Sequence, residues 1–223
     1  MKITYTRSEQ TAKNIITFLF SPSQKLKYLP GQFIEINLPH SNPDKLGTKR
    51  WFTLSSSPTE DLISITTKRS VPSSTFKSTL LKLEPNQEIS ISDPMGDFVL
   101  PKDTTIPLVF VAGGIGVTPY RSMIKHLIDS KIPRDITLLY AANDSSEFAF
   151  LDIFSEYGTK IIKLIAQPLS AKTIIDLTSP SHNHRIYISG PEPIVECIVE
   201  QFKQTSISED QLVTDYFPGY SKI

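Results

Sequence analysis

The sequence predicts a chain in two parts, an antiparallel β-barrel followed by a doubly wound parallel α/β sheet. Three observations indicate this fold class. The first half holds short runs rich in β-branched and aromatic residues, separated by turn-forming residues. From about residue 105, apolar runs alternate with stretches of helical period. The length of 223 residues suits two domains, which we place at 1–102 and 103–223.

Five runs in the first half have the composition of strands: "NIITFLF", "QFIEINL", "RWFTLS", "LISITTK" and "EISIS". Five or six strands at this spacing are typical of an antiparallel barrel or sandwich. One helix is expected within "STFKSTLLKL", because Phe76, Leu80 and Leu83 recur at helical spacing.

The second half alternates strands with helices. "PLVFVAG" is an unbroken apolar run, as expected of a parallel strand that is covered on both faces. The elements expected after it are, in order, "TPYRSMIKHLIDSK", "DITLLYAA", "FAFLDIFSEY", "KIIKLIA", "AKTIIDL", "RIYISG", "PIVECIVEQFK" and "QLVTDYF". This alternation predicts right-handed crossovers and a parallel sheet. Cys197 shares a helix face with Ile194 and Ile198, so we expect it in the core.

Composition argues against several functional classes. Lysine plus arginine and aspartate plus glutamate both total 23, which gives no electrostatic reason to expect nucleic acid or an anionic membrane. Cys197 is the only cysteine, which excludes a disulfide framework and a cysteine-ligated cluster within the chain. His182 and His184 have no carboxylate or cysteine nearby, so no metal site is expected. Without an apolar run of membrane-span length or a signal peptide, we expect a cytoplasmic protein.

The turn "AGGIGVTP" is the strongest local signal. Gly113, Gly114 and Gly116 lie between a buried strand and a helix, and they allow a ligand to approach the backbone closely. Thr118 suits the helix N-cap and Pro119 the first helical position. The unpaired N–H groups of a helix N-terminus suit a phosphate. The spacing departs from GxGxxG, so a tight turn without a ligand explains this stretch equally well.

A second turn of this kind follows the strand "RIYISG". Ser189, Gly190 and Pro191 lie where that strand meets the next helix. Ligands of open α/β sheets bind at the carboxyl ends of the strands. Two glycine-bearing turns at one edge of the sheet favour a nucleotide site.

The stretch "RWFTLSSSP" sets an arginine beside two aromatic residues and a run of hydroxyl groups. Alone, Arg50 fits a surface charge, and Trp51 and Phe52 fit a core. The segments "ITTKR" (65–69) and "SSTFK" (73–77) add further hydroxyl groups and bases.

Together, these three segments have the donors that a pyrophosphate requires. Arg50 and Arg69 would supply forked N–H donors. Ser74 or Thr75 would stand at the N-terminus of the expected helix, which is also favourable for an anion.

Five segments, "KRWFTLSSSP", "DPMGDFVLP", "FVAGGIGVTPYRSMI", "YISGPEPIV" and "DYFPGY", together resemble the ferredoxin–NADP reductase family of flavoproteins. They occur in that family's order and cover nearly the whole chain. The resemblance implies an FAD-binding barrel at 1–102 and a nicotinamide-nucleotide domain at 103–223. Hydride would pass between the two cofactors where the domains meet.

The resemblance also implies roles for individual residues. "R-W-F-T" resembles the family's arginine-x-tyrosine-serine/threonine motif, so Arg50 would bind the FAD pyrophosphate, Phe52 would pack on the flavin and Thr53 would hydrogen-bond near flavin N5. The residues implied to bind FAD are Arg50, Trp51, Phe52, Thr53, Thr66, Thr67, Lys68, Arg69, Ser73, Ser74, Thr75, Phe76 and Lys77.

The residues implied to bind the nicotinamide nucleotide are Gly113, Gly114, Gly116, Val117, Thr118, Pro119, Ser189, Gly190 and Pro191. Phe217 or Tyr220 would cover the flavin face by offset stacking. The residues implied to act in catalysis are Thr53, Ser189, Phe217 and Tyr220.

The chain departs from the family pattern in three places. Phe52 replaces the more usual tyrosine, and Ser189 stands where many members carry cysteine. The segment at 73–77 lacks the glycine that is frequent before its serine.

The choice of nucleotide depends on the bases near the adenosine ribose. "YAANDSSEF" has no base and carries Asp144 and Glu147, which suit a free 2′-hydroxyl. Residues 166–167 are Ala-Gln, where NADP users in the family often have Ser-Arg. We therefore favour NADH over NADPH, with Lys172 and Arg185 as the two bases that could reach a 2′-phosphate.

The function expected is that of an FAD-dependent NAD(P)H oxidoreductase that passes electrons to a ferredoxin, flavodoxin, cytochrome or small molecule. Its partners would be a nicotinamide nucleotide and a candidate redox protein. Three alternatives stay open: an electron-transfer subunit of a larger complex, a flavin-binding module that does not turn over nicotinamide, and a nucleotide-binding scaffold without flavin.

Overall fold

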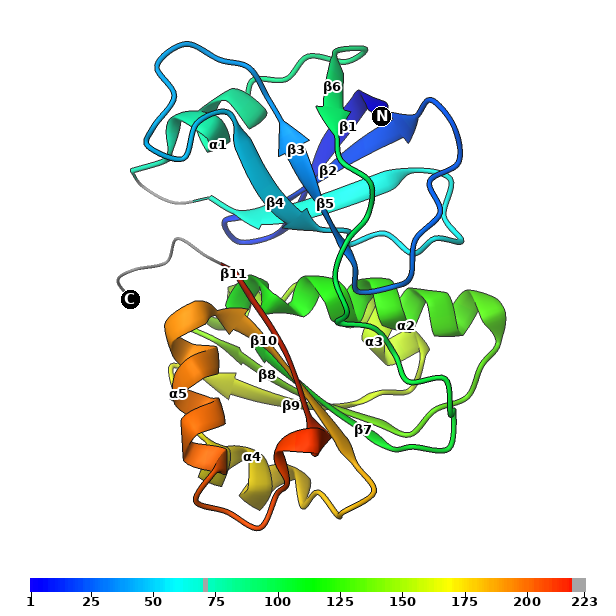
Figure 1. The fold of residues 1–223 in the computed structure, drawn as a ribbon, viewed down its shortest axis with the longest axis vertical. Coiled ribbons are helices and arrows are strands. Elements are labelled where there is room, and N and C mark those ends of the chain that lie inside the picture. The colour runs from blue at the N-terminus through cyan, green and yellow to red at the C-terminus, as the bar shows by residue number, and fades with distance from the viewer. Residues whose placement is uncertain (70–71, 218–223) are drawn as a thin grey trace.

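The protein is described by a computed structural model that covers residues 1–69 and 72–217. Figure 1 shows two units, an upper one built around an antiparallel sheet and a lower one built around a parallel sheet. This arrangement confirms the predicted fold class.

The first unit contains a six-stranded antiparallel sheet in the order β4-β3-β6-β1-β2-β5. Its elements are β1 (Lys2–Ala12), β2 (Ile15–Pro22), β3 (Phe33–Asn37), β4 (Lys49–Thr53), β5 (Ile63–Lys68), α1 (Thr75–Leu80) and β6 (Glu88–Ile91). A β-bridge between Leu54 and Ile65 brings together the two edges of the sheet, so that the sheet curls into a barrel.

The five predicted strands and the predicted helix of this unit are confirmed, and β1 is an addition to them. Ile3 and Tyr5 are buried, whereas residues 7–10 are exposed. With so few apolar positions, β1 carries little of the alternation that identifies a strand in a sequence.

The second unit contains a five-stranded parallel sheet in the order β11-β10-β7-β8-β9. Its strands are β7 (Leu108–Gly113), β8 (Ile136–Ala142), β9 (Lys160–Ile165), β10 (Arg185–Pro191) and β11 (Leu212–Phe217). Its helices are α2 (Thr118–Ser130), α3 (Leu151–Glu156), α4 (Ala171–Thr178) and α5 (Glu192–Phe202), with short 3₁₀ turns η1 (Gly114–Val117), η2 (Ser145–Glu147) and η3 (Glu209–Gln211). Each predicted strand and helix of this half is confirmed.

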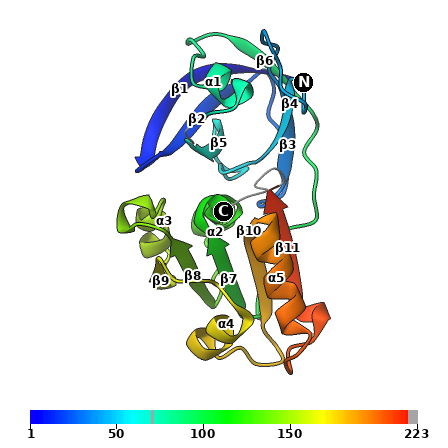
Figure 2. The same cartoon turned by 90° about the vertical axis from the view of Figure 1, so that its left-hand side faces the viewer.

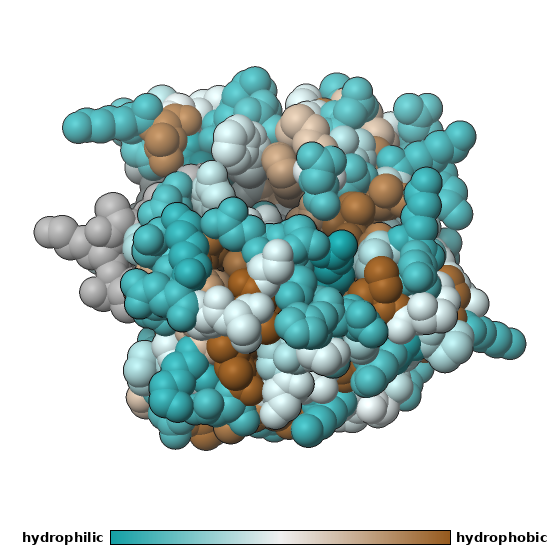
Figure 3. All heavy atoms as spheres, turned by 60° about the horizontal axis from the view of Figure 1, so that its bottom comes forward, coloured by the Kyte–Doolittle hydropathy of each residue, from teal (hydrophilic) through white to brown (hydrophobic). Residues whose placement is uncertain are grey.

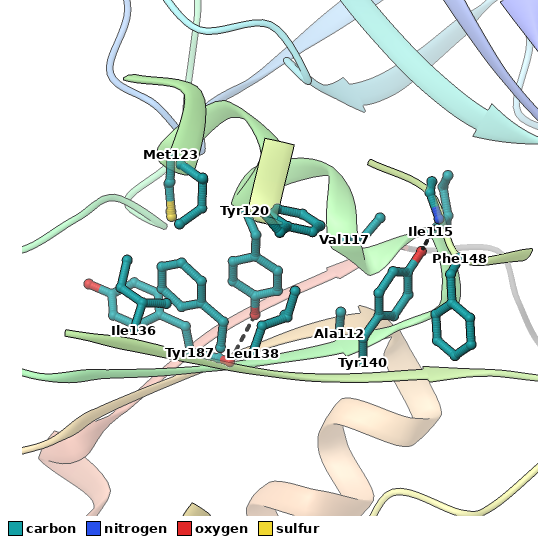
Figure 4. Close-up of a cluster of buried hydrophobic side chains, with 14 of the residues drawn as sticks. Ala112, Ile115, Val117, Tyr120, Met123, Ile136, Leu138, Tyr140, Phe148 and Tyr187 are labelled. Carbon is teal, nitrogen blue, oxygen red and sulfur yellow. Dashed lines mark hydrogen bonds between the residues drawn. The ribbon is translucent and has the colours of Figure 1, made fainter. Parts of the chain in front are cut away.

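Helices cover both faces of the parallel sheet. Figure 2 shows α2 and α3 on the face toward the first unit, and α4 and α5 on the opposite face. Side chains alternate accordingly along β7, where Phe110 packs with α2 and Val111 with α5. In Figure 4, Tyr120 of α2 points at the sheet, and its hydroxyl lies 2.8 Å from the carbonyl oxygen of Tyr187.

The prediction that Cys197 lies in the core is wrong. Cys197 is exposed, and the buried positions of α5 are Val195, Ile198 and Phe202. Because successive helical residues turn by about 100°, the residue next to Ile198 can already face solvent. The amide Nε2 of Gln201 lies 3.3 Å from the Cys197 sulfur.

Residues 92–107 connect the last strand of the first sheet to the first strand of the second, and the proposed boundary at 102/103 lies within them. Phe98 is buried in the core of the second unit, with its ring 5.2 Å from that of Tyr187. The Tyr187 hydroxyl also donates to the carbonyl of Val99 at 2.7 Å. The connection is therefore packed against the second unit before the proposed boundary is reached.

No helix within residues 1–69 and 72–217 is both long and apolar enough to cross a membrane. Figure 3 shows the face that includes the lower end of the second unit, where hydrophobic atoms form small separate groups among polar ones.

Candidate functional site

The two glycine-bearing turns meet at the carboxyl edge of the parallel sheet. β7 ends at Gly113, and β10 carries Gly190 on the neighbouring strand. A Cβ atom added to Gly113 would lie 3.7 Å from the Cα atom of Gly190, so the two backbones are in contact. The predicted single edge for both turns is confirmed, and it is the edge where open α/β sheets bind ligands.

Two positions of the first turn, Gly114 and Gly116, require glycine for different physical reasons. A Cβ atom on Gly116 would lie 2.1 Å from the carbonyl oxygen of Ser189, so this glycine is required by packing within the protein. Gly114 has a φ of +56° and nothing within 4 Å of an added Cβ atom. Gly114 is thus the glycine of this turn with open space beside it.

The prediction that Thr118 caps α2 is wrong. The 3₁₀ turn at Gly114–Val117 precedes the helix directly, so Thr118 already has helical geometry and its N–H donates to the carbonyl of Ile115. The Thr118 hydroxyl donates to the same carbonyl at 3.1 Å. Pro119 stands in the first turn of α2, at the second helical position and not at the first as predicted, because the helix already begins at Thr118.

Ser189 lies beside a carboxylate that sequence reasoning missed. Ser189 on β10 pairs with Asp215 on β11, and the serine hydroxyl is 3.4 Å from Asp215 Oδ2. Burial raises the pKa of Asp215 to about 6, although hydrogen bonds from Ser189 and from the Tyr216 N–H act in the opposite direction. The sequence signal that could have identified Asp215 is the presence of an acidic residue inside the predicted last strand, "QLVTDYF".

Phe217 is the last residue of β11 and pairs with Pro191, so it stands at the same edge as Ser189. It is half-buried against the core of the second unit. Figures 1 and 2 both show the carboxyl end of β11 directed toward the first unit. Tyr220, the other residue predicted to cover the flavin, lies outside the described residues.

Arg50 and Phe52 share one face of β4 with Phe76 of α1. The Arg50 guanidinium lies 5.2 Å from the centre of the Phe76 ring, and Phe52 stacks on that ring at 5.9 Å. Arg50 Nη2 donates to Asp44 Oδ1 at 2.5 Å. Trp51 points to the other face of the strand, 56% exposed, with its ring 5.9 Å from that of Phe33.

Thr53 ends β4 and is buried, with 5% of its surface exposed. Within the part of the chain that the structure describes, its hydroxyl group makes no hydrogen bond. The nearby Ser55 hydroxyl, in contrast, has partners within the protein: it is hydrogen-bonded to Ser64 at 3.0 Å and to Thr66 at 2.9 Å. Thr66 bonds in turn to Thr17 at 2.9 Å. The Thr66 hydroxyl is therefore held in an internal hydrogen-bond network, whereas the Thr53 hydroxyl is available to bond to a ligand.

Five of the predicted FAD-binding residues gather around one small hollow: Thr67, Lys68, Arg69, Ser73 and Lys77. The hollow has about 10 Å³, close to the space of one water molecule. The Ser73 hydroxyl is buried without a hydrogen bond to any described residue, and burial lowers the pKa of Lys77.

The next two predicted residues have partners within the protein. The Ser74 hydroxyl caps the six-residue helix α1 by accepting from the Lys77 N–H at 3.2 Å. The Thr75 hydroxyl lies 3.2 Å from His40 Nε2.

The two acidic residues predicted near the adenosine ribose contact the first unit. Lys68 Nζ lies 2.8 Å from Glu147, whose side chain is 11% exposed. Asp144 accepts from Lys13 at 3.5 Å, and hydrogen bonds from Ser146 hold the pKa of the Asp144 carboxyl at about 2. Both carboxylates help to join the two units.

The described residues contain no group of three or more histidine, cysteine, aspartate or glutamate side chains that could hold a metal ion.

Comparison with known proteins agrees with this geometry. Residues 110–166 match the family described as "Oxidoreductase NAD-binding domain". The ferredoxin reductase component of 3-ketosteroid-9-alpha-monooxygenase from Mycobacterium tuberculosis is 25% identical over 206 residues, which cover 88% of this chain and 56% of that protein. The chain spans a little over half the length of the curated relatives that it matches first.

Solved structures share the whole fold. The flavohem-like FAD/NAD binding domain of nitric oxide dioxygenase from Vibrio cholerae has a TM-score of 0.80 and 18% identity, with 97% of this chain and 98% of that chain covered. Ferredoxin–NADP+ reductase from Plasmodium falciparum has a TM-score of 0.80 and 17% identity, with 97% and 95% covered. The chain therefore has the fold of ferredoxin–NADP reductase, as the sequence motifs predicted, and residues 110–166 within it match the oxidoreductase NAD-binding family.

Proposed function

We propose that this protein is a flavoprotein oxidoreductase, which oxidises NADH and passes the electrons through FAD to an acceptor. FAD supplies the redox chemistry when it is bound, since a flavin takes up two electrons together and releases them singly or in pairs. The observation that carries the proposal is that each unit holds one such site, Arg50–Thr53 in the first and the Gly113–Gly190 edge in the second, and that β11 at this edge is directed toward the first unit (Figures 1 and 2).

The donors of the first unit fit a dinucleotide such as FAD. The Thr53 hydroxyl makes no hydrogen bond to another described residue, and the Ser73 hydroxyl is buried without a partner. The Arg50 guanidinium lies over the Phe76 ring and is bound to the Asp44 carboxylate, and a planar guanidinium that binds a carboxylate can bind a phosphate in the same forked way. In this proposal Arg50 binds the pyrophosphate, Phe52 packs on the ring system and Thr53 donates near the hydride-accepting nitrogen.

The second unit supplies the residues for the nicotinamide nucleotide. Gly114 leaves open space before α2, where a pyrophosphate would meet backbone N–H groups. Ser189 and Phe217 stand at the same edge, Ser189 to orient the nicotinamide and Phe217 to cover the flavin face. We propose 102/103 as the division between the residues that bind FAD and those that bind the nicotinamide nucleotide, although the connecting segment packs with the second unit from Phe98 onward.

NADH is the proposed electron donor because the candidate bases for a 2′-phosphate are poorly placed. Arg185 begins β10 and lies near Asp210 at 3.6 Å, at the opposite end of the strand from Gly190. Lys172 pairs with Asp176 at 2.5 Å. Residues 166–168 are exposed and contain no base.

Anaerobic stopped-flow measurement at about 450 nm tests the function. The purified protein, reconstituted with FAD, is mixed separately with NADH and NADPH. Rapid bleaching, faster with NADH, is the expected result. A protein that holds FAD but is bleached by neither nucleotide would instead be a flavin-binding module, and a protein that FAD cannot reconstitute would contradict the proposal from Arg50 onward.

A role as the reductase component of a larger system is the second candidate. The match to a monooxygenase's ferredoxin reductase component favours it. Copurification with a redox protein that is reduced faster than free dyes would support this candidate. We also propose a cytoplasmic location, which fractionation of cells would test.

A further inference from the structure

Helix α2 contacts both units of the protein. It begins directly after the Gly114–Val117 turn, which belongs to the proposed nucleotide site. Figure 1 shows α2 lying along the top of the parallel sheet, directly beneath the first unit. Its side chains Arg121 and Ser122, within the first turn and a half, cross to the first unit.

Arg121 makes a forked contact with the first unit. Its Nη2 donates to Glu60 Oε1 at 2.8 Å, and its Nη1 donates to Glu60 Oε2. The same Nη1 donates to the carbonyl oxygen of Ser55 at 3.0 Å. The side chains of Arg121 and Glu60 are only 14% and 26% exposed, so the pair is largely shielded from water.

Further hydrogen bonds fix the segment that Arg121 holds. The Ser122 hydroxyl donates to the carbonyl of Ser56 at 2.5 Å. The Ser57 N–H donates to Glu60 Oε2 at 2.7 Å, so Glu60 is bound from both sides. We call Arg121, Ser122 and Glu60, with the carbonyl groups of Ser55 and Ser56, the α2 clamp.

The α2 clamp joins the two chain segments that carry the proposed cofactor sites. Ser55 follows Thr53 by two residues along the same extended segment, a separation of about 7 Å. Arg121 follows Thr118 by three residues, about one turn of the helix. A hydride donor and acceptor must be held within about 3–3.5 Å, and a misplacement of about 1 Å can cost 10²-fold in rate.

We propose that Arg121, oriented by Glu60, is a positioning residue for hydride transfer, which fixes the Thr53 strand end relative to the Gly113–Thr118 turn. This role rests on the proposed function. Arg121 touches neither cofactor in it and acts through the carbonyl group of Ser55. Lysine cannot reproduce the forked contact, because its ammonium group is a point charge on a flexible chain.

The test compares Arg121→Ala, Arg121→Lys and Glu60→Ala in the stopped-flow assay on FAD-loaded protein. Arg121→Ala and Glu60→Ala should lower the limiting rate of flavin bleaching about tenfold or more, while the Kd for NADH changes by less than about threefold. Arg121→Lys should recover part of the rate. The double variant should be no slower than the slower single variant, because both remove one contact.

Lys13→Ala is the matched control. It removes another ion pair between the units, Lys13–Asp144 at 3.5 Å, without touching Ser55. It should keep the wild-type rate. Hydrogen exchange adds a readout without turnover, in which Arg121→Ala should speed exchange of the Ser55–Ser57 amides and Lys13→Ala should not.

The outcomes separate the two proposals. A wild-type protein that holds FAD but is bleached by neither nucleotide would overturn the proposed function, and the role of Arg121 in hydride transfer with it. A bleached wild-type protein with an equally fast Arg121→Ala variant would overturn the α2 clamp alone. A loss of rate explained wholly by lost FAD, or unchanged exchange at Ser55–Ser57, would also overturn it.

Discussion

Ser189 and Asp215 stand opposite each other on neighbouring parallel strands, with the serine hydroxyl 3.4 Å from the carboxylate. The pair lies next to Gly190, at the edge of the sheet where the two glycine-bearing turns meet. Because the Asp215 carboxyl has a raised pKa of about 6, it can hold or release a proton near neutral pH.

Asp215→Asn should stabilise the protein at neutral pH. The folded-state pKa of about 6 lies above the ordinary aspartate value, so the folded protein binds more protons than the unfolded chain between these two values. The free energy of unfolding due to this group therefore falls as the pH rises from about 4 to 6. The variant should be more stable by roughly 2–3 kcal/mol at pH 7–8 and nearly equal to wild type near pH 4. Urea unfolding at four pH values measures this.

Asp210→Asn is the control for this experiment. Its side chain is 74% exposed beside Arg185, and such surface pairs contribute little. A gain in stability from Asp215→Asn that did not depend on pH would contradict a titrating Asp215.

Gly116→Ala should cost stability, because the new methyl group would lie 2.1 Å from the carbonyl oxygen of Ser189. We expect a loss of roughly 1–3 kcal/mol, as for other overpacked sites. Gly114→Ala is the comparison, since its methyl group has open space and only the positive φ of +56° opposes it. Gly114→Ala should therefore impair binding of the nucleotide more than stability, and equal effects at both positions would contradict different roles.

Thr53→Val should slow flavin reduction by about tenfold or more and weaken FAD binding much less. The variant removes a hydroxyl that makes no hydrogen bond to a described residue, so little stability is lost. Stopped-flow rates and FAD titration separate the two quantities. Thr17→Val is the matched control, because it breaks hydrogen bonds to Thr11 and Thr66 and should cost about 1 kcal/mol of stability without slowing reduction.

Gln167→Arg should move the nucleotide preference toward NADPH by about tenfold, since a charged hydrogen bond to a phosphate is worth about 1.5–3 kcal/mol. Gln167 is exposed and follows Ala166, whose φ is 50°. The ratio of kcat/KM for the two nucleotides measures the change. Gln204→Arg is the control: it adds the same charge at an exposed position two residues after α5 and should leave the ratio unchanged.

Much of the fold was predictable from periodicity and turn chemistry, because β7 and α2 each carry a strong local pattern. The shared edge of Gly113 and Gly190 followed from the rule that parallel strands end together. β1 was missed because its exposed residues hide its alternation.

The α2 clamp left no local signal. Arg121 and Glu60 are 61 residues apart, and only the docking of the two units brings them together. The sequence predicts Thr118 as a cap because it does not reveal the 3₁₀ turn that precedes the helix. The ion pair of Glu147 with Lys68 could not be predicted for the same reason, because Lys68 belongs to the other unit.

Phe98 has a consequence for anyone who divides this chain into fragments. Its ring lies among Tyr120 and Tyr187, so a fragment starting at residue 103 would leave a hole where an aromatic side chain belongs. Loss of such a side chain typically costs 3–5 kcal/mol, a large part of the stability of a small domain. The second unit, produced on its own, should therefore fold well only if its first residue precedes Phe98.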